Sequence, residues 1–308
     1  MKKFNFDFYK NRKILFGISI GLIVIGLIFN FIRGTKMDIQ FVGGAMIKYS
    51  VDGEVDTDEI ASLVKEETGR DVSVALSKTF GTDANQVTLS FAGNEAVTLD
   101  EQQAIATKLS DAYADRTFNV VESSSVDPTM GAKFFQKCLV CLLITFVILL
   151  VYIELRFQKI GGLSAGVTAL IALVHDVLLV YFSFVIFGFS INDIFIAVIL
   201  TILGYSMHDT IVLFDRIREN LALKKAGSKQ TLEDIVNLSI TQTFTRSINT
   251  SLTTFIMVFV LFLLGVSSIR EFALPLMVGI VCGTYSSVCV TGALWYVLTT
   301  RKQKKAEK

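Results

Sequence analysis

The sequence predicts an α-helical membrane protein with six transmembrane helices and one ferredoxin-like α+β domain on the extracytoplasmic side. The first observation is composition: 52% of the 308 residues are hydrophobic and the mean hydropathy is +0.57, more than one soluble core needs. The second is a series of apolar runs long enough to cross a bilayer and face its lipid. The third is charge, because an acidic stretch follows the first run and basic stretches flank the others.

Six apolar runs are the predicted spans, since each comes close to the roughly 20 residues that a bilayer core of about 30 Å requires. They lie at residues 14–32, 136–154, 163–187, 191–214, 244–266 and 272–298. The first run follows Lys10, Arg12 and Lys13, which fits either a signal peptide or a first anchor. Its length and the lack of a small-residue cleavage site favour the anchor.

Basic residues give the predicted orientation, because Lys and Arg next to spans stay in the cytoplasm. Between Arg33 and Lys133 there are 17 acidic and 9 basic residues, whereas the rest of the chain holds 11 acidic and 20 basic residues. The predicted cytoplasmic segments are the N-terminus 1–13, the loop 215–242 and the tail 299–308. The predicted external segments are the domain 33–135 and two short turns at 188–190 and 267–271. The net charge of +1 carries no signature of nucleic-acid binding.

The external segment contains short alternating patterns rather than membrane runs. Strands are predicted at 45–51, 72–76, 86–91 and 117–121, and amphipathic helices at 57–67 and 99–112. The order βαββαβ is the ferredoxin-like pattern, an architecture that hosts many functions. Gly43 and Gly44 stand at its entrance, where a turn is the more common explanation and a close backbone approach the alternative.

The four cysteines, Cys138, Cys141, Cys282 and Cys289, all lie in apolar runs. The external segment has none, so no disulfide framework is predicted. Cys138 and Cys141 form a C-x-x-C within one predicted membrane helix and lack a second ligand pair. We therefore expect packing rather than metal binding.

Five ionisable side chains fall within the predicted spans and are the functional candidates. They are His175 and Asp176 in the third span, His208 and Asp209 in the fourth, and Arg246 at the start of the fifth. Such a group near the bilayer centre costs several kcal/mol unless it is paired, hydrated or protonated. For His175 and Asp176, a functional role and plain interhelical hydrogen bonding are both open.

Asp209 and Arg246 are expected to meet at one depth, since each lies a few turns from the same predicted loop. A static ion pair is one interpretation; the other is that Asp209 alternates between pairing with Arg246 and being protonated. Tyr205, His208 and Asp209 have i, i+3, i+4 spacing and are predicted to share a helix face, a polar seam beside Gly204. Gly204 permits close packing of a neighbouring helix.

Four segments resemble the SecF family of bacterial protein-export membrane subunits, in the expected order. They are ALVHDVL at 172–178, GYSMHDTIVLFDRIREN at 204–220, FTRSINTSLTT at 244–254 and GTYSS at 283–287. The resemblance implies half of an RND-type transporter in the bacterial cell membrane. It would work with SecD at the SecYEG channel and use an H⁺ or Na⁺ gradient to help draw unfolded polypeptide outward. No covalent catalysis and no bound cofactor or metal are implied.

The resemblance also assigns roles to residues. The family's coupling carboxylate falls on Asp209, with Thr210 beside it in the seam, and its intramembrane arginine falls on Arg246; its polar pair in the third span falls on His175 and Asp176. Two positions depart from the family pattern: His208 stands where Asn is usual, and Gln40 where Asp is frequent. Because His titrates near neutral pH, His208 either adds a proton step or replaces the Asn hydrogen bond.

Two rival functions remain open at the level of sequence. One is a self-contained RND-like exporter of lipids or small molecules, built as a homodimer of six-span halves. The other is a membrane-anchored sensor whose outer domain binds a ligand. A sensor would not need a carboxylate and an arginine inside the bilayer, and copurification of a separate SecD chain distinguishes the exporter.

Overall fold

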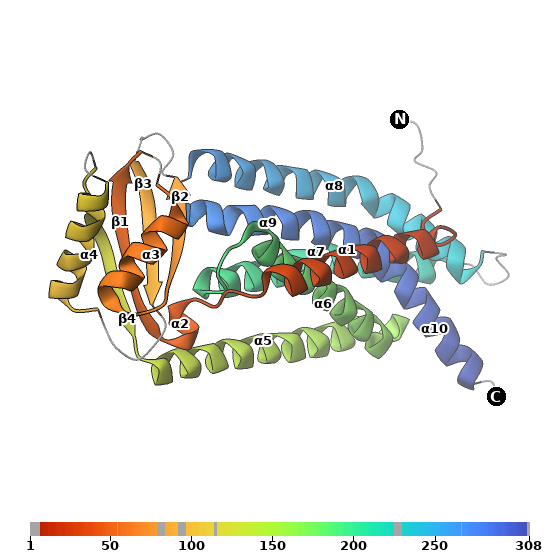
Figure 1. The fold of residues 1–308 in the computed structure, drawn as a ribbon. Coiled ribbons are helices and arrows are strands. Elements are labelled where there is room, and N and C mark those ends of the chain that lie inside the picture. Colours follow the sequence, from red (N-terminus) through yellow and green to blue (C-terminus); the bar gives the residue numbers. More distant parts are fainter. Residues whose placement is uncertain are drawn as a thin grey trace.

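A computed structural model describes residues 7–53, 55–78, 84–91, 97–113, 116–224, 230–265 and 267–306. Parts of the predicted N-terminus (1–6), loop (225–229) and tail (307–308) lie outside the described residues. Figure 1 shows a small α+β domain stacked on one end of a bundle of long helices. The first helix of the bundle, α1 (Arg12–Arg33), begins at the end of the bundle that is far from this domain. The last helix, α10 (Gly292–Ala306), ends there.

The outer domain is a four-stranded sheet with the order β2-β3-β1-β4, in which all neighbouring strands are antiparallel. Its elements are β1 (Gly44–Asp52), α3 (Thr57–Thr68), β2 (Val72–Lys78), β3 (Ala84–Phe91), α4 (Leu99–Ala112) and β4 (Asn119–Val126). The central pair is in register with Tyr49 opposite Val87. The predicted ferredoxin-like βαββαβ order is confirmed.

Alternation along the strands builds the core of this domain. Ile47 and Tyr49 of β1 and Leu89 of β3 are fully buried, and they pack with Ile60 of α3 and Leu109 of α4. The helices begin where the sequence supplies caps. The Asp56 side chain accepts from the Asp58 amide at the start of α3, and Thr98 with Glu101 forms a capping box for α4.

The last strand differs from the prediction of 117–121, because it runs from Asn119 to Val126. Six of its eight residues are exposed, and its Ser-rich second half carries no apolar alternation. It is a strand because its backbone pairs with β1 along one edge of the sheet, with a bulge between Lys48 and Tyr49. Side-chain pattern alone does not reveal such a strand.

Gly43 and Gly44 join the short helix α2 (Ile39–Val42) to β1. Both have positive φ angles, 81° and 140°, which L side chains rarely adopt. A Cβ on Gly44 would lie 2.2 Å from the Phe91 carbonyl oxygen. The pair therefore makes a sharp turn and also allows a close approach of two backbones.

Within the described residues, six helices are long and apolar enough to span a membrane. They are α1, α5 (Pro128–Arg156), α6 (Gly162–Phe187), α7 (Asp193–Leu223), α8 (Leu232–Leu264), and the interrupted span of α9 (Ser267–Tyr285), a π-helical turn (Ser286–Thr291) and α10. In α6, α7 and the last span, 56%, 56% and 61% of the apolar window is buried, against 11–17% in α1, α5 and α8. Helices α6 and α7 and the last span therefore form the inside of the bundle.

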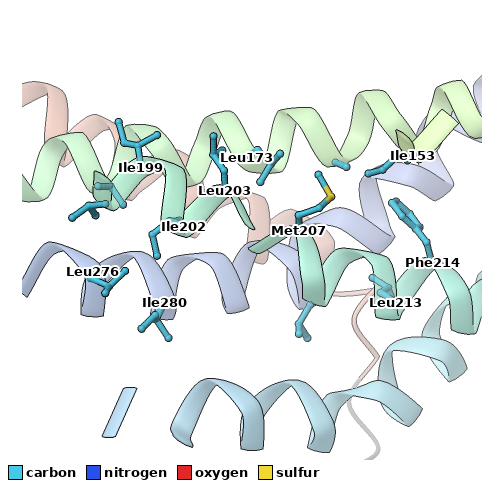
Figure 2. Close-up of a cluster of buried hydrophobic side chains, with 14 of the residues drawn as sticks. Ile153, Leu173, Ile199, Ile202, Leu203, Met207, Leu213, Phe214, Leu276 and Ile280 are labelled. Atoms are coloured by element: carbon cyan, nitrogen blue, oxygen red, sulfur yellow. The ribbon is translucent and has the colours of Figure 1, made fainter. Parts of the chain in front are cut away.

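Apolar side chains pack closely between these inner helices. Figure 2 shows Leu173, Ile199, Ile202 and Ile280 among the side chains that point between the helices. Glycine brings two of the helices close, since a Cβ on Gly279 of α9 would lie 2.5 Å from the Ile202 side chain of α7. Small residues are a common means of such packing in membranes.

The polar segments between spans are more helical than predicted. The expected loop 215–242 is largely helix, because α7 continues to Leu223 and α8 begins at Leu232 behind a Thr231 capping box. The expected turn at 267–271 is the first turn of α9. Charged residues mark where a chain leaves the hydrocarbon, and a helix is free to continue beyond that point.

Candidate functional site

A polar cluster surrounds the Asp176 carboxylate where α6, α7 and the π turn meet. Asp176 is fully buried, and its Oδ2 atom accepts hydrogen bonds from the hydroxyls of Ser206 at 2.6 Å and Ser286 at 2.8 Å. Its Oδ1 atom lies 3.0 Å from Nδ1 of His175. The two candidates of the third span thus belong to one site, and no Lys or Arg among the described residues forms an ion pair with Asp176.

The π turn supplies two of the hydroxyls in this cluster. Ser286 and Ser287 are its first residues, and both are buried. Gly283 lies one turn earlier, where a Cβ would come within 3.1 Å of the Ser206 side chain and 3.6 Å of Asp176 Oδ2. The close approach of α9 to α7 therefore depends on this glycine. Single π turns within α-helices are frequent at functional sites.

Hydroxyl contacts continue along α7 toward Asp209. Ser287 Oγ lies 3.0 Å from Thr210 Oγ1 and 3.5 Å from Ser206 Oγ, and it also donates to the Ser206 carbonyl oxygen at 3.1 Å. Thr210 follows Asp209 directly. The hydroxyl contacts therefore run from the Asp176 carboxylate to Thr210, the neighbour of Asp209 in the sequence.

Asp209 is 5% exposed and lies beside Ser247 of α8. Its Oδ2 atom has no hydrogen-bond partner among the described residues. Asp209 is the seventeenth of the 31 residues of α7, so it lies about 24 Å along the helix at 1.5 Å per residue. A buried carboxylate with one unpaired oxygen is costly, which makes Asp209 the candidate position for ion binding.

Arg246 does not contact Asp209 directly in this structure. It is on α8, next to Ser247, and its side chain is exposed. Among the described residues no ion pair joins it to Asp209, although its charge is near enough to act on that carboxylate. The hydroxyl of Ser247, rather than the guanidinium, occupies the position next to the carboxylate.

The rest of the predicted polar seam divides between two directions. Asp209 and Thr210 point into the bundle, Tyr205 is half-buried, and His208 and Gly204 face outward. A Cβ on Gly204 would meet no atom within 4 Å, so the described residues do not supply the close helix neighbour expected there. The i, i+3, i+4 spacing spans an arc of the helix wide enough to reach both inside and outside.

A short linker ties the outer domain to the inner helices. Met37 forms a parallel bridge with Ile191 in the turn between α6 and α7, through Asp38 N–H to Ile191 O at 3.0 Å and Ile191 N–H to Lys36 O at 2.8 Å. Gln40 accepts a 3.3 Å hydrogen bond from the Asp193 amide at the start of α7. Backbone hydrogen bonds therefore connect the turn between the helices that carry Asp176 and Asp209 to the entrance of the outer domain.

Family and structural comparisons agree with this layout. The model "Protein export membrane protein SecD/SecF, C-terminal" matches residues 105–301. The protein translocase subunit SecF of Petrotoga mobilis is 34% identical over 303 residues, which cover 97% of this chain and 98% of that protein. The chain belongs to the SecD/SecF family. SecF of Sebaldella termitidis is also 34% identical, covering 97% of this chain and 94% of that protein.

Larger SecDF proteins contain the whole SecF-like unit. The chain is 34% identical to SecDF of Bacillus subtilis, covering 97% of this chain and 39% of that protein. The crystal structure of SecDF from Thermus thermophilus, described as a translocon-associated membrane protein, has a TM-score of 0.82 at 27% identity over 96% of this chain and 39% of that one. A SecDF crystal structure in a super-membrane-facing form has a TM-score of 0.68 at 27% sequence identity, over 98% of this chain and 40% of that one.

Several polar residues of this site were not singled out by sequence reasoning, although all of them lie in the segments that resemble SecF. They are Ser206, Ser286, Ser287 and Ser247, and their contacts depend on how the helices pack together. An isolated serine in an apolar run is unremarkable, because membrane helices tolerate it. One available signal was the spacing of Ser206 and Thr210, four residues apart on one face of α7.

Proposed function

We propose that this SecF translocase subunit works with SecD and uses an H⁺ or Na⁺ gradient to promote the late stage of polypeptide export through SecYEG. The observation that carries the proposal is the buried Asp209 carboxylate, which has one oxygen without a partner among the described residues. Binding and release of an ion there changes the charge between α7 and α8. A membrane potential of about 100 mV supplies about 2.3 kcal/mol per charge.

SecD is the proposed partner for two reasons. The SecDF relatives carry a SecF-like unit in one longer chain. In addition, His208 on α7 and Arg246 on α8 are exposed at the surface of the isolated chain, although polar and charged groups are costly against lipid. A second membrane subunit packed against α7 and α8 would cover both.

The outer domain is the proposed moving part. One observation supports this: the backbone bridge between Met37 and Ile191 joins the outer domain to the α6–α7 turn. The orientation proposed from the basic clusters places this domain outside, with both termini in the cytoplasm. In that position it meets exported polypeptide.

The test is the Asp209→Asn substitution in a strain that depends on this protein for export. We expect gradient-dependent precursor export to be lost while membrane insertion continues, because the amide takes up no proton and carries no charge. Asp215→Asn is the matched control, since Asp215 lies on the same helix but is paired with Arg156 and Arg218. Normal export in the Asp209→Asn strain would rule out ion coupling at this site.

Copurification in mild detergent separates the rival functions. A stable complex with a separate SecD chain is expected here, whereas a homodimer would point to a self-contained exporter. Preserved export in the absence of a gradient would instead favour a ligand-sensing role for the outer domain.

A further inference from the structure

We propose that the Asp176 cluster is a second proton-binding site, distinct from Asp209, from which the hydroxyls of Ser206, Ser287 and Thr210 lead toward Asp209. This inference rests on the proposed ion coupling and names the ion as a proton. It also assigns a role to the π turn, which brings Ser286 and Ser287 into the site.

The cluster can hold one proton more or less without moving its side chains. Asp176 Oδ2 is in contact with two hydroxyl groups, Ser206 and Ser286, at 2.6 and 2.8 Å. A hydroxyl either donates or accepts, so one of them turns to accept when the carboxyl takes up a proton. His175 Nδ1 lies against the other oxygen, and its Nε2 is buried without a hydrogen-bond partner among the described residues.

The surroundings of Asp176 favour a proton over a metal cation. The titratable groups that face it are His175 beside it on α6 and Cys282 from α9. Its Oδ2 and the two serine oxygens are already in direct hydrogen-bonding contact. A hard cation takes six or more oxygen ligands at its own coordination distances, and it would have to push these oxygens apart.

The hydroxyls give the proton a route toward Asp209. In a relay each hydroxyl accepts a proton on one side and releases its own on the other, so no charge is left behind. The route runs from Asp176 to Ser206, across 3.5 Å to Ser287, and across 3.0 Å to Thr210, the residue after Asp209. Loss of the Ser287 hydroxyl breaks this route without touching either carboxyl.

Infrared difference spectroscopy of the purified SecD–SecF complex during a pH titration tests the site directly. We expect a protonated-carboxyl band that disappears in Asp176→Asn and persists in Asp209→Asn. Ser206→Ala and Ser286→Ala should each change its frequency, because the carboxyl loses a hydrogen-bond partner. Ser183→Ala is the matched control, since Ser183 is buried on the same helix and donates only to the Val180 carbonyl.

Several outcomes overturn the proposal. They are a titration in which Asp176→Asn removes no band, a band that is lost on exchange of potassium for sodium, and a band insensitive to both serine substitutions. If Asp176→Asn does not assemble with SecD, the serine variants still decide. In export assays, Ser287→Ala should reduce gradient-dependent export about tenfold, equivalent to about 1.4 kcal/mol.

The two proposals fail separately. Loss of export in Asp209→Asn together with an absent Asp176 band removes the second site and leaves ion coupling in place. Normal export in Asp209→Asn removes ion coupling at Asp209, whatever the Asp176 spectrum shows.

Discussion

The outer domain and the membrane half are built on opposite principles. Among the described residues, the buried side chains of the outer domain are apolar except for Asn85 and Gln102. The membrane half buries many hydroxyl and ionisable groups, among them Asp176, Ser206 and Asp209. Apolar burial stabilises a domain in water, whereas inside lipid it gives helices little reason to associate.

The difference indicates where stability and function reside. Substitutions in the outer core are expected to reduce stability and leave ion coupling intact. Substitutions at the polar groups of the bundle are expected to impair ion coupling and to change stability little, because their hydrogen bonds add little net stability. Each prediction below tests one side of this contrast.

The largest effect is expected for Arg246→Met. This change removes a positive charge that acts on Asp209, so gradient-dependent export should fall as severely as in Asp209→Asn while the helices still insert. Precursor export in living cells is the measurement. Arg216→Met serves as the control, since Arg216 pairs with the nearby Glu219 and with no other acidic residue among those described. A fully active Arg246→Met protein would contradict the assigned role.

Much of the outer domain was predictable because its local signals agree. Alternating residues such as Ile47 and Tyr49 face one core, and Thr98 with Glu101 marks a helix start. The Ser-rich second half of β4 was not predictable, because it pairs with β1 through its backbone and carries no apolar alternation.

In the membrane half, hydropathy located the spans. Asp176 and Asp209 stood out in the sequence because ionisable side chains are rare inside apolar runs. The partners of those groups come from other helices, as with Ser286 and Ser247. Which way a residue faces also depends on packing, so Gly204 and His208 proved to point outward. One sequence does not contain that information, because it depends on which helices pack against each face.

A core substitution in the outer domain is expected to have the next largest effect. The substitution is Leu89→Ala, because Leu89 is fully buried at the centre of the sheet. Such changes in cores lower the free energy of unfolding by about 2–5 kcal/mol. Hydrogen exchange of outer-domain amides in the full-length protein measures the loss. Val121→Ala on the exposed edge strand should cause little change; equal effects at both positions would argue against an apolar core as the source of stability.

Gly44→Ala should destabilise the entrance by a smaller amount, about 1–3 kcal/mol for the strained backbone. Its φ of 140° and the nearby Phe91 carbonyl both oppose a Cβ. Gly69→Ala is the comparison, because Gly69 also has a positive φ but no atom within 4 Å of a Cβ. Protease sensitivity of the outer domain should rank Gly44→Ala above Gly69→Ala, and the opposite ranking would show that the close approach is unimportant.

The smallest effect concerns Tyr49, whose hydroxyl donates to the Gln102 carbonyl oxygen at 3.0 Å inside the outer core. Tyr49→Phe should cost about 1 kcal/mol, the usual net value of one hydrogen bond. Burial raises the pKa of Tyr49 from 10.0 to about 12. The folded domain thus holds this proton more tightly than the unfolded chain, so stability should fall as pH rises through that interval. Urea unfolding followed by circular dichroism at about pH 7 and about pH 11 measures this effect. Between the two pH values, the unmodified protein should lose more stability than Tyr49→Phe does. Equal losses of stability would mean that Tyr49 is not what makes this small apolar core sensitive to alkali.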